Sequence, residues 1–374
     1  MRVYFDNAAT TPLSEEVSDA MLRVMRDVFG NPSSIHADGR KARATVEEAR
    51  KKVAHLIGAS IGEVFFTSGG TESNNMALKN AVRDLDVRRI ISSPIEHHCV
   101  LHTADRLAAA GVQVERLPVD ELGRMDYAGL EARIQTGAGH TLVSLMHANN
   151  EIGTMIDLRR VGDLCREAGV LFHSDTVQTM GHFPFDLSQT YLSFCSGSAH
   201  KFHGPKGTGF IYINNDNQIE PFIDGGSQER NMRAGTENIA GIVGLATALE
   251  LACREMEERK AHILGLRSYL AGELQRHFTD IRFNGEQEFP FLYTVLSVSF
   301  PPSAKSELLL LHLDIAGISA SGGSACSSGA EAGSHVLEAL GGEPDRKTIR
   351  FSFSHYNTRE EIDFLIGKMK GILG

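Results

Sequence analysis

Short apolar runs alternate with stretches of helical periodicity along much of this chain, and no other feature of the sequence constrains the fold as strongly. The runs have the length of buried β-strands, and they lie at residues 64–66, 89–91, 112–117, 142–146, 170–172, 192–194 and 210–213. Strands that alternate with helices pair into a mostly parallel sheet, because each helix carries the chain back across one face of the sheet. The sequence therefore predicts an α/β fold.

Two of the predicted helices have clear limits. From Arg40 to Gly58, apolar residues recur at helical spacing, and Gly58 supplies a stop signal. Asp157 can cap the start of a second helix, which Gly169 would end. Each of these helices ends shortly before a predicted strand, as an α/β fold requires.

The strict alternation ends near residue 250, and a chain of 374 residues is longer than one typical domain. We predict a large α/β domain over residues 15–250 and a smaller α+β domain over residues 251–374. The N-terminal segment 1–14 is expected to pack with the small domain. In the small domain, strands are predicted at 294–300 and 348–353, and a final helix at 358–373.

The composition is that of an ordinary globular protein, with 42% hydrophobic and 22% charged residues. A net charge of -10 without a long basic run argues against a nucleic-acid partner. No apolar run reaches the roughly 18 to 20 residues of a membrane span, and the N-terminus lacks the pattern of a signal peptide. We therefore expect a cytoplasmic protein without a membrane partner.

Five scattered cysteines do not form a disulfide framework or a C-x-x-C metal pair, so reduced thiols are expected. The run from Glu96 to Cys99 contains two histidines and could suggest a metal site. Adjacent side chains point in different directions on a helix or a strand, however. We therefore predict no metal site.

Polar residues gather just beyond three of the predicted strands. The clusters lie at 149–151, 174–178 and 198–201. Ligands of open α/β sheets bind outside the carboxyl ends of the strands. We therefore expect the three clusters to converge on one site.

Lys201 has the surroundings of a lysine that forms a Schiff base, because it follows a strand end among Ser and His residues that can desolvate it. The alternative is a solvated surface lysine, a role that Lys206 in the same loop could also fill. Asp175, with Gln178 nearby, could supply the carboxylate that a pyridinium nitrogen needs, and His97 a ring that stacks on a cofactor. The Gly-rich segment 66–75 suits a phosphate, although such a turn is often only a tight connection.

The chain resembles the cysteine desulfurases nearly from end to end. The motifs are FDNAATTP (5–12), FGNPSSIH (29–36), FTSGGTESNN (66–75), IEHH (95–98), ANNEIGT (148–154), SAHKFHGPKG (198–207), GSACSSG (323–329) and RFS (350–352). The resemblance implies the aspartate-aminotransferase-like fold of fold type I, pyridoxal 5′-phosphate as cofactor, and a homodimer. GSACSSG is similar to the subgroup that serves iron–sulfur and nitrogenase cluster assembly.

The resemblance also implies roles for individual residues. The cofactor-binding residues would be Gly70, Thr71, His97, Asn150, Asp175, Gln178, Ser198, His200, Lys201 and Thr236. Thr236 would reach the phosphate from the other subunit. Arg350 would hold the substrate carboxylate, consistent with the fork that a guanidinium offers, and Asn150 would also touch the substrate. Lys201, Cys326 and His97 would be the catalytic residues.

By the same resemblance, L-cysteine would be converted to L-alanine and its sulfur would pass to Cys326. An iron–sulfur scaffold or another acceptor protein would then take the sulfur. Eight of the eleven residues from Ser319 to Gly329 are Gly or Ser, a composition that predicts a mobile loop. The alternative for Cys326 is a small buried hydrophobe.

Three other functions remain open at this point. A selenocysteine lyase or a small-molecule aminotransferase could use the same fold, although an aminotransferase needs no mobile thiol. A binding protein could have kept the fold and lost catalysis. A loss of catalysis is disfavoured, because every expected cofactor position holds a residue that can perform its role.

Overall fold

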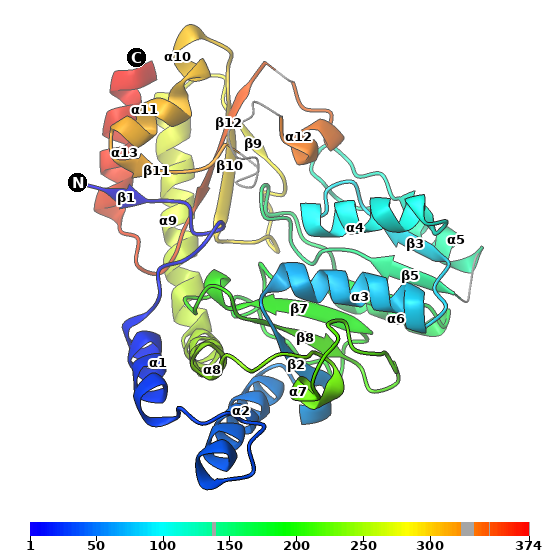
Figure 1. Ribbon diagram of the computed structural model, residues 1–374. Coiled ribbons are helices and arrows are strands. Elements are labelled where there is room, and N and C mark those ends of the chain that lie inside the picture. The colour runs from blue at the N-terminus through cyan, green and yellow to red at the C-terminus, as the bar shows by residue number, and fades with distance from the viewer. Residues whose placement is uncertain (137–139, 323–332, 344, 374) are drawn as a thin grey trace.

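The computed structural model describes residues 1–136, 140–322, 333–343 and 345–373. Two bodies are apparent in Figure 1: a lower one built on a broad sheet, and an upper one that contains the C-terminal helix. The helix α9 (Met256–His277) begins near the lower body, after α8, and runs along the upper one. Strand β1 (Val3–Tyr4) lies in the upper body, whereas the helix α1 (Glu15–Asp27) lies in the lower one. The N-terminal segment therefore crosses from one body to the other.

The broad sheet has seven strands in the described part of the chain, in the order β2-β8-β7-β6-β5-β3-β4. They are β2 (Val64–Thr67), β3 (Arg89–Ser92), β4 (Gln113–Arg116), β5 (Thr141–Ser144), β6 (Leu171–Asp175), β7 (Phe194–Ser198) and β8 (Gly209–Ile213). The strands from β4 across to β7 pair in parallel, and β8 pairs antiparallel with both β7 and β2. The predicted α/β fold with a mostly parallel sheet is confirmed.

Strand β7 lies further along the chain than the sequence indicates. The apolar run at 192–194 predicts a strand there, whereas β7 spans Phe194–Ser198. Ser196 and Gly197 lie in the middle of the strand and carry no hydrophobic signal, although every residue of β7 is buried. Small residues fit here because a Cβ at Gly197 would lie 2.2 Å from the ring of Phe210.

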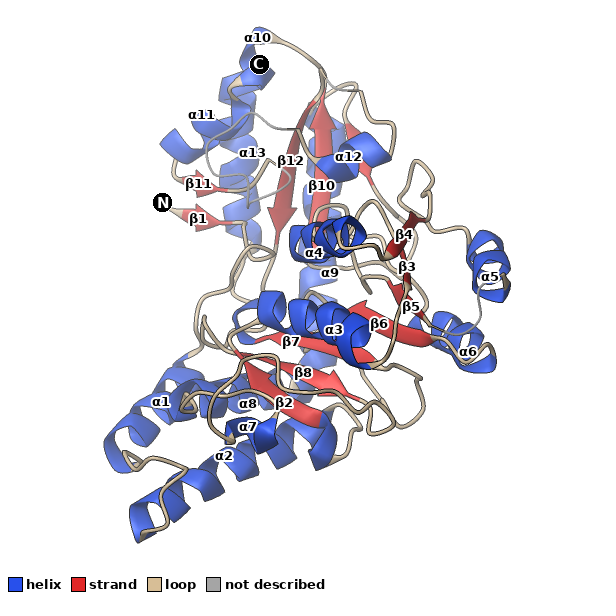
Figure 2. Cartoon of the chain, turned by 45° about the vertical axis from the view of Figure 1, so that its right-hand side comes forward, coloured by secondary structure: helices blue, strands red, loops and turns tan. Residues whose placement is uncertain are grey.

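Helices cover both faces of the broad sheet. They are α2 (Ala37–Leu56), α3 (Gly70–Asp84), α4 (His98–Ala109), α5 (Tyr127–Gln135), α6 (Leu158–Glu167), α7 (Gln228–Asn231) and α8 (Ile239–Arg254), with short 3-10 turns η1 (Ile61–Glu63) and η2 (Ala199–Lys201). Helices α3 and α4 share one apolar cluster with the sheet, and α1, α2, α5, α6 and α8 share the cluster on its other face. Figure 2 shows α3 above the sheet and α2 and α8 below it. Alternate strand residues such as Ile90 and Ile91 face opposite clusters, and each fully buried side chain of this kind contributes about 1.5–3 kcal/mol.

The two helices with predicted limits form close to the expected positions. Helix α2 begins at Ala37, three residues before Arg40, because the His36 side chain caps it by accepting from the amide of Gly39 at 3.3 Å. Asp157 caps α6 and accepts from the amide of Arg160 at 3.0 Å. Gly58 and Gly169 have φ of 67° and 65°, a conformation that glycine adopts without strain.

The upper body contains a three-stranded antiparallel sheet in the order β12-β10-β9. Its elements are β9 (Arg282–Asn284), β10 (Val295–Phe300), α10 (Ala304–Glu307), α11 (Leu309–Ile315), β11 (Ile318–Ser319), α12 (His335–Ala339), β12 (Lys347–Ser352) and α13 (Arg359–Leu373). Strand β1 pairs in parallel with β11, so the first residues of the chain join this body. Helix α8 continues to Arg254, so residue 250 falls inside a helix. The division of the chain at that residue stays a prediction.

A buried ion pair holds the segment that leads to Thr236. Arg50 and Glu229 are 1% and 4% exposed, and two hydrogen bonds of 2.7 and 2.9 Å join their charged groups. The amide of Phe66 also donates to Glu229 at 2.8 Å. Glu229 and the two residues after it have φ of 45°, 55° and 64°, an unfavourable left-handed run. The ion pair therefore stabilises a strained turn.

No helix of the described residues is long and apolar enough to cross a membrane. The four cysteines that the structure describes are free thiols.

Acid should destabilise this fold through its buried histidines. Burial lowers the pKa of His147 and His203 to about 3, and that of His173 and His182 to about 4. An unfolded histidine titrates near 6.5, so below about pH 6.5 the unfolded chain takes up protons that the folded chain refuses. Each of these residues should lower the free energy of unfolding by up to about 1.4 kcal/mol per pH unit as the pH falls toward 4.

Urea unfolding between pH 7.5 and pH 5 measures this slope. His147→Gln should make the slope shallower by the contribution of one histidine, whereas the change of the exposed His55 to Gln should leave it as it is. Equal slopes in all three proteins would contradict the assignment.

Candidate active site

A cavity of about 340 Å³ lies where the carboxyl ends of β6 and β7 meet the upper body. Ten of the residues that the sequence assigns to the site line it: Gly70, Thr71, His97, Asn150, Asp175, Gln178, Ser198, His200, Lys201 and Arg350. Asp175 and Ser198 are the last residues of β6 and β7, and Asn150 follows β5. The three predicted clusters therefore converge, as expected for ligands outside the carboxyl ends of parallel strands.

Two assigned residues are not among those that line the cavity. Thr236 is exposed, so within a single chain it takes no part in this site. Cys326 lies in the segment 323–332, outside the described residues.

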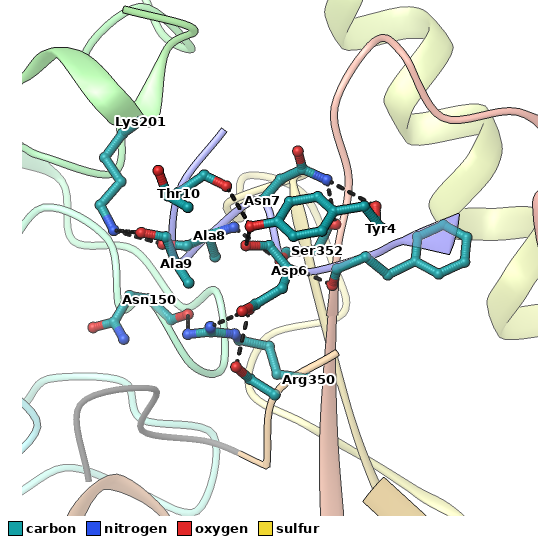
Figure 3. A network of polar contacts seen from close by, with 12 residues as sticks. Tyr4, Asp6, Asn7, Ala8, Ala9, Thr10, Asn150, Lys201, Arg350 and Ser352 are labelled. Carbon is teal, nitrogen blue, oxygen red and sulfur yellow. Dashed lines mark hydrogen bonds and ion pairs between the residues drawn. The ribbon is translucent and has the colours of Figure 1, made fainter. Parts of the chain in front are cut away.

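Lys201 lies in the turn η2 directly after β7, and its side chain extends toward the N-terminal segment. Its Nζ donates to the carbonyl oxygens of Ala8 and Ala9 at 2.7 and 2.8 Å, as Figure 3 shows. Both alanines also line the cavity. Lys201 is half-buried, whereas Lys206 in the same loop is exposed. Of the two lysines, only Lys201 reaches this cavity.

Asp175 supplies a buried carboxylate at the base of the cavity. Its side chain accepts from the amide nitrogen of Asn74 at 2.7 Å and from the backbone of Val177 at 3.0 Å. The residue is 6% exposed. A buried carboxylate that faces a cavity favours a ligand with a positive charge on that side.

His97 caps α4, and its Nδ1 accepts from the amide of Cys99 at 3.2 Å. Burial lowers the pKa of His97 below its usual 6.5, against the opposing effect of Asp175, so the ring is neutral at physiological pH. Burial likewise lowers the pKa of His200 to about 4. Both rings therefore offer uncharged surfaces to the cavity. No group of three or more ligand-type side chains in the described ranges could hold a metal.

One end of the cavity is built to receive an anion. Helix α3 begins there after Gly69, which has φ of 149°, and the first amides of a long helix point outward with a partial positive charge. A Cβ on Gly70 would lie 2.5 Å from Val177, so a glycine is required for the close approach. A second hollow of about 320 Å³ shares Gly70, Thr71, Ser198 and His200 with this end, and Lys206 lines its rim.

Arg350, on β12, brings a cation to the cavity from the upper body. The residue is 1% exposed, and it donates to Asp6 Oδ1 and to the carbonyl of Asn150, each at 2.9 Å (Figure 3). Ser321 also donates to Asp6 at 2.9 Å. The Nε of Arg350 has no hydrogen-bond partner among the described residues. The guanidinium therefore links both bodies, and its Nε remains a donor without an acceptor in the described part of the chain.

Sequence reasoning missed several residues that line the cavity or hold its groups. Asp6, Ala8 and Ala9 lie in the motif FDNAATTP, and Asn74 lies in FTSGGTESNN, so the motifs themselves contained the signal. His335 also lines the cavity, from the start of α12. Nothing in the sequence around His335 marked it as a site residue.

Comparisons with known proteins place this geometry in a family. The model of the family described as aminotransferase class-V matches residues 3–365. A cysteine desulfurase IscS from Dictyoglomus turgidum is 43% identical over 375 residues, which cover 99% of this chain and 94% of that protein. The solved structure of a NifS-like protein superposes with a TM-score of 0.91 at 40% identity, covering 100% of this chain and 99% of that one. A structure of SspA in complex with cysteine superposes with a TM-score of 0.82 at 29% identity over 96% of this chain and 100% of that one.

The pair of Asp6 and Arg350 should matter for stability as well as for the site. Asp6→Asn keeps the shape of the side chain but removes the charge that faces a buried guanidinium. We expect the free energy of unfolding to fall by about 2–4 kcal/mol, because a buried cation is left without its carboxylate. Urea-induced unfolding measures the loss.

Asp105→Asn is the matched control, because Asp105 pairs with Arg116 at the surface. An exposed pair of this kind contributes about 0.5 kcal/mol or less. If both variants lose the same free energy of unfolding, the pair of Asp6 and Arg350 contributes no more than an exposed surface pair.

Proposed function

This chain belongs to the aminotransferase class-V family, among its cysteine desulfurases, and we propose that its cavity binds pyridoxal 5′-phosphate and L-cysteine and yields L-alanine and a persulfide. Enzymes of this family use pyridoxal phosphate. The single observation that supports the proposal best is the placement of Lys201, Asp175 and the start of α3 around one cavity. An amine, a buried carboxylate and an anion site are the three groups that this cofactor requires.

The residues fit the cofactor part by part. The amides at the start of α3, with Ser198 and His200, would hold the phosphate, and Gly70 lets the start of the helix approach Val177 closely. Asp175 would face the ring nitrogen and favour its protonated form. The neutral ring of His97 would stack on the cofactor, and Gln178 and Asn150 would contact its polar edge or the substrate. Lys201 would hold the cofactor through its side-chain nitrogen.

When bound, pyridoxal phosphate supplies a carbonyl carbon that links to amines and a conjugated ring that stores electrons from the substrate. The residues of the chain do the rest. The Nζ of Lys201 would take the proton from the α-carbon of cysteine, because it is the nitrogen displaced when the substrate amine arrives. Arg350 would hold the substrate carboxylate with the donors that Asp6 and Asn150 leave unused.

Cys326, outside the described residues, would receive the sulfur. In that step the Cβ–Sγ bond of the substrate breaks and a sulfur–sulfur bond to Cys326 forms. The electron pair of the broken bond would remain on the carbon side and take up a proton at Cβ, and Lys201 would return a proton to the α-carbon to complete alanine. The thiol must be reduced for this chemistry, which is why we also propose a cytoplasmic location.

We further propose a homodimer in which Thr236 completes the phosphate site of the partner. Thr236 is exposed and lies beyond the cavity of its own chain, yet the buried pair of Arg50 and Glu229 holds the segment that carries it. An exposed residue on a firmly held loop suits a contact between subunits. The sulfur would pass on to an acceptor protein such as an iron–sulfur scaffold.

The purified protein should release alanine and sulfide together when it is given L-cysteine, pyridoxal phosphate and a reductant. An aminotransferase would give neither product in that pairing. Cys326→Ser should lose sulfide release and the persulfide mass increment, because no thiol remains to attack the substrate sulfur. The assay measures both products, and intact-protein mass spectrometry measures the persulfide.

Cys165→Ser is the control for this assay. Cys165 is buried on α6, and burial raises the pKa of its thiol to about 12, so it cannot act as the nucleophile. We expect it to keep both activities. Full sulfide release by Cys326→Ser would remove this cysteine from the mechanism.

Lys201→Ala should abolish the borohydride-reducible link between protein and cofactor, because no other amine of the described chain lines the cavity. The visible absorption of the protein should change accordingly. Peptide mapping after reduction locates the link, and Lys206→Ala is the control because Lys206 is exposed at the rim. A reduced link that persists in Lys201→Ala would place the cofactor on another residue.

A further inference from the structure

Three buried side chains form a hydrogen-bonded chain behind Asp175. Ser144 Oγ lies 2.9 Å from His173 Nδ1, and His173 Nε2 lies 3.1 Å from Asn74 Oδ1. Asn74 Nδ2 then donates to Asp175 Oδ2 at 2.7 Å. Ser144, His173 and Asn74 are each no more than 1% exposed. This series of hydrogen bonds therefore runs through the buried interior and ends on the carboxylate of Asp175.

The sheet itself brings these residues together. Ser144 and His173 are directly paired across the neighbouring strands β5 and β6. His173 and Asp175 lie two positions apart on β6, so their side chains point to the same face of the sheet. Helix α3, which carries Asn74, packs on that face against β6 and β7 (Figure 2). No flexible loop takes part in the arrangement.

The direction of every hydrogen bond in the chain follows from the carboxylate. A carboxylate only accepts, so the amide nitrogen of Asn74 must face Asp175 and its oxygen must face His173. His173 Nε2 must then carry the proton. Burial lowers the pKa of His173 to about 4, so the ring is neutral and its Nδ1 is an acceptor for the hydroxyl of Ser144. One arrangement of protons satisfies all four groups.

We infer that Asn74 and His173, with Ser144 behind them, are positioning residues that hold Asp175 in the orientation in which it meets the cofactor. This inference rests on the proposed function, in which Asp175 faces the ring nitrogen. Without His173, the Asn74 oxygen loses its donor, and the amide is held only through its nitrogen, by Asp175 at 2.7 Å and Cys99 Sγ at 3.3 Å. The other contacts of the Asp175 carboxylate, to Val177 and Ser196, are longer at 3.0 and 3.4 Å, so a loosely held Asn74 leaves Asp175 less firmly oriented.

The affinity of the apoprotein for pyridoxal phosphate tests the inference without reference to turnover. His173→Leu should raise the dissociation constant about tenfold to a hundredfold, the range expected when a hydrogen bond to a charged group is lost. The visible absorption of the bound cofactor should shift its pH dependence in the same variant. His173→Gln should recover most of the affinity, because a glutamine amide can donate to Asn74 and accept from Ser144.

A double-mutant cycle separates positioning from a merely structural role. Asn74→Leu removes the link through which His173 acts, so it should weaken cofactor binding by itself. In that background, His173→Leu should change the dissociation constant by less than about twofold, since the path is already broken. If the dissociation constant of the double variant rises by the product of the two single effects, His173 does not act through Asn74.

Two further variants guard against misfolding as an explanation. Ser144→Ala removes one hydroxyl at the far end of the chain, and it should weaken binding about two- to tenfold, as for a neutral hydrogen bond. His147→Leu is the matched control, because His147 is also buried but bonds to Thr179. This variant should change the temperature of thermal unfolding but leave the dissociation constant for the cofactor unchanged.

The possible results distinguish this inference from the proposed function. If the unaltered protein binds no pyridoxal phosphate, the proposed function fails and the inference fails with it. If the unaltered protein binds the cofactor and His173→Leu, Asn74→Leu and Ser144→Ala bind it equally well, only the inference is overturned. Weaker binding in His147→Leu, of the same size as in His173→Leu, would also overturn it.

Discussion

The site depends on the N-terminal segment, which passes between the two bodies and is bound by both. Its backbone carbonyls at Ala8 and Ala9 accept from Lys201, and the same oxygen of Ala8 accepts from Gln178 at 3.0 Å. On the other side, Asn7 donates to the carbonyl of Ser352 at 2.9 Å. Buried backbone groups must find partners, so this segment fixes the position of β12 relative to the broad sheet. Arg350 reaches the cavity because of this constraint.

Few charged groups line the described part of the cavity. Lys201 and Arg350 provide the cations, and Asp175 and Glu151 the carboxylates that line the cavity. Asp6 pairs with Arg350, and the rings of His97 and His200 are neutral because they are buried. A ligand with both charges can therefore be oriented by opposite ends of one cavity. In the low-dielectric interior such interactions are stronger than in water, and they need no reorganisation when the ligand arrives.

Two buried carboxylates, Glu229 outside the cavity and Asp175 in its wall, are stabilised in the same way. The left-handed turn at Glu229 persists because Arg50 and the amide of Phe66 satisfy its buried carboxylate. The chain from Ser144 through His173 to Asn74 satisfies a second buried carboxylate, Asp175. In both cases, a group that would be costly to bury alone has hydrogen-bond partners, and the surrounding backbone gains one defined geometry.

The sequence by itself determined the sheet and most of its strands from local signals, and its motifs identified ten of the residues that line the cavity through their resemblance to cysteine desulfurases. Apolar runs mark strands, Asp157 and Gly169 limit a helix, and the motifs around Lys201 lie at strand ends, where parallel sheets bind ligands. Only the tertiary structure decided the partners of these residues. Asp6 meets Arg350 across 344 positions, and Asn74 meets Asp175 across 101. The position of β7, hidden by Ser196 and Gly197, was decided in the same way. Pairings of this kind depend on which surfaces come together in the fold, and no periodicity of a single segment encodes that choice.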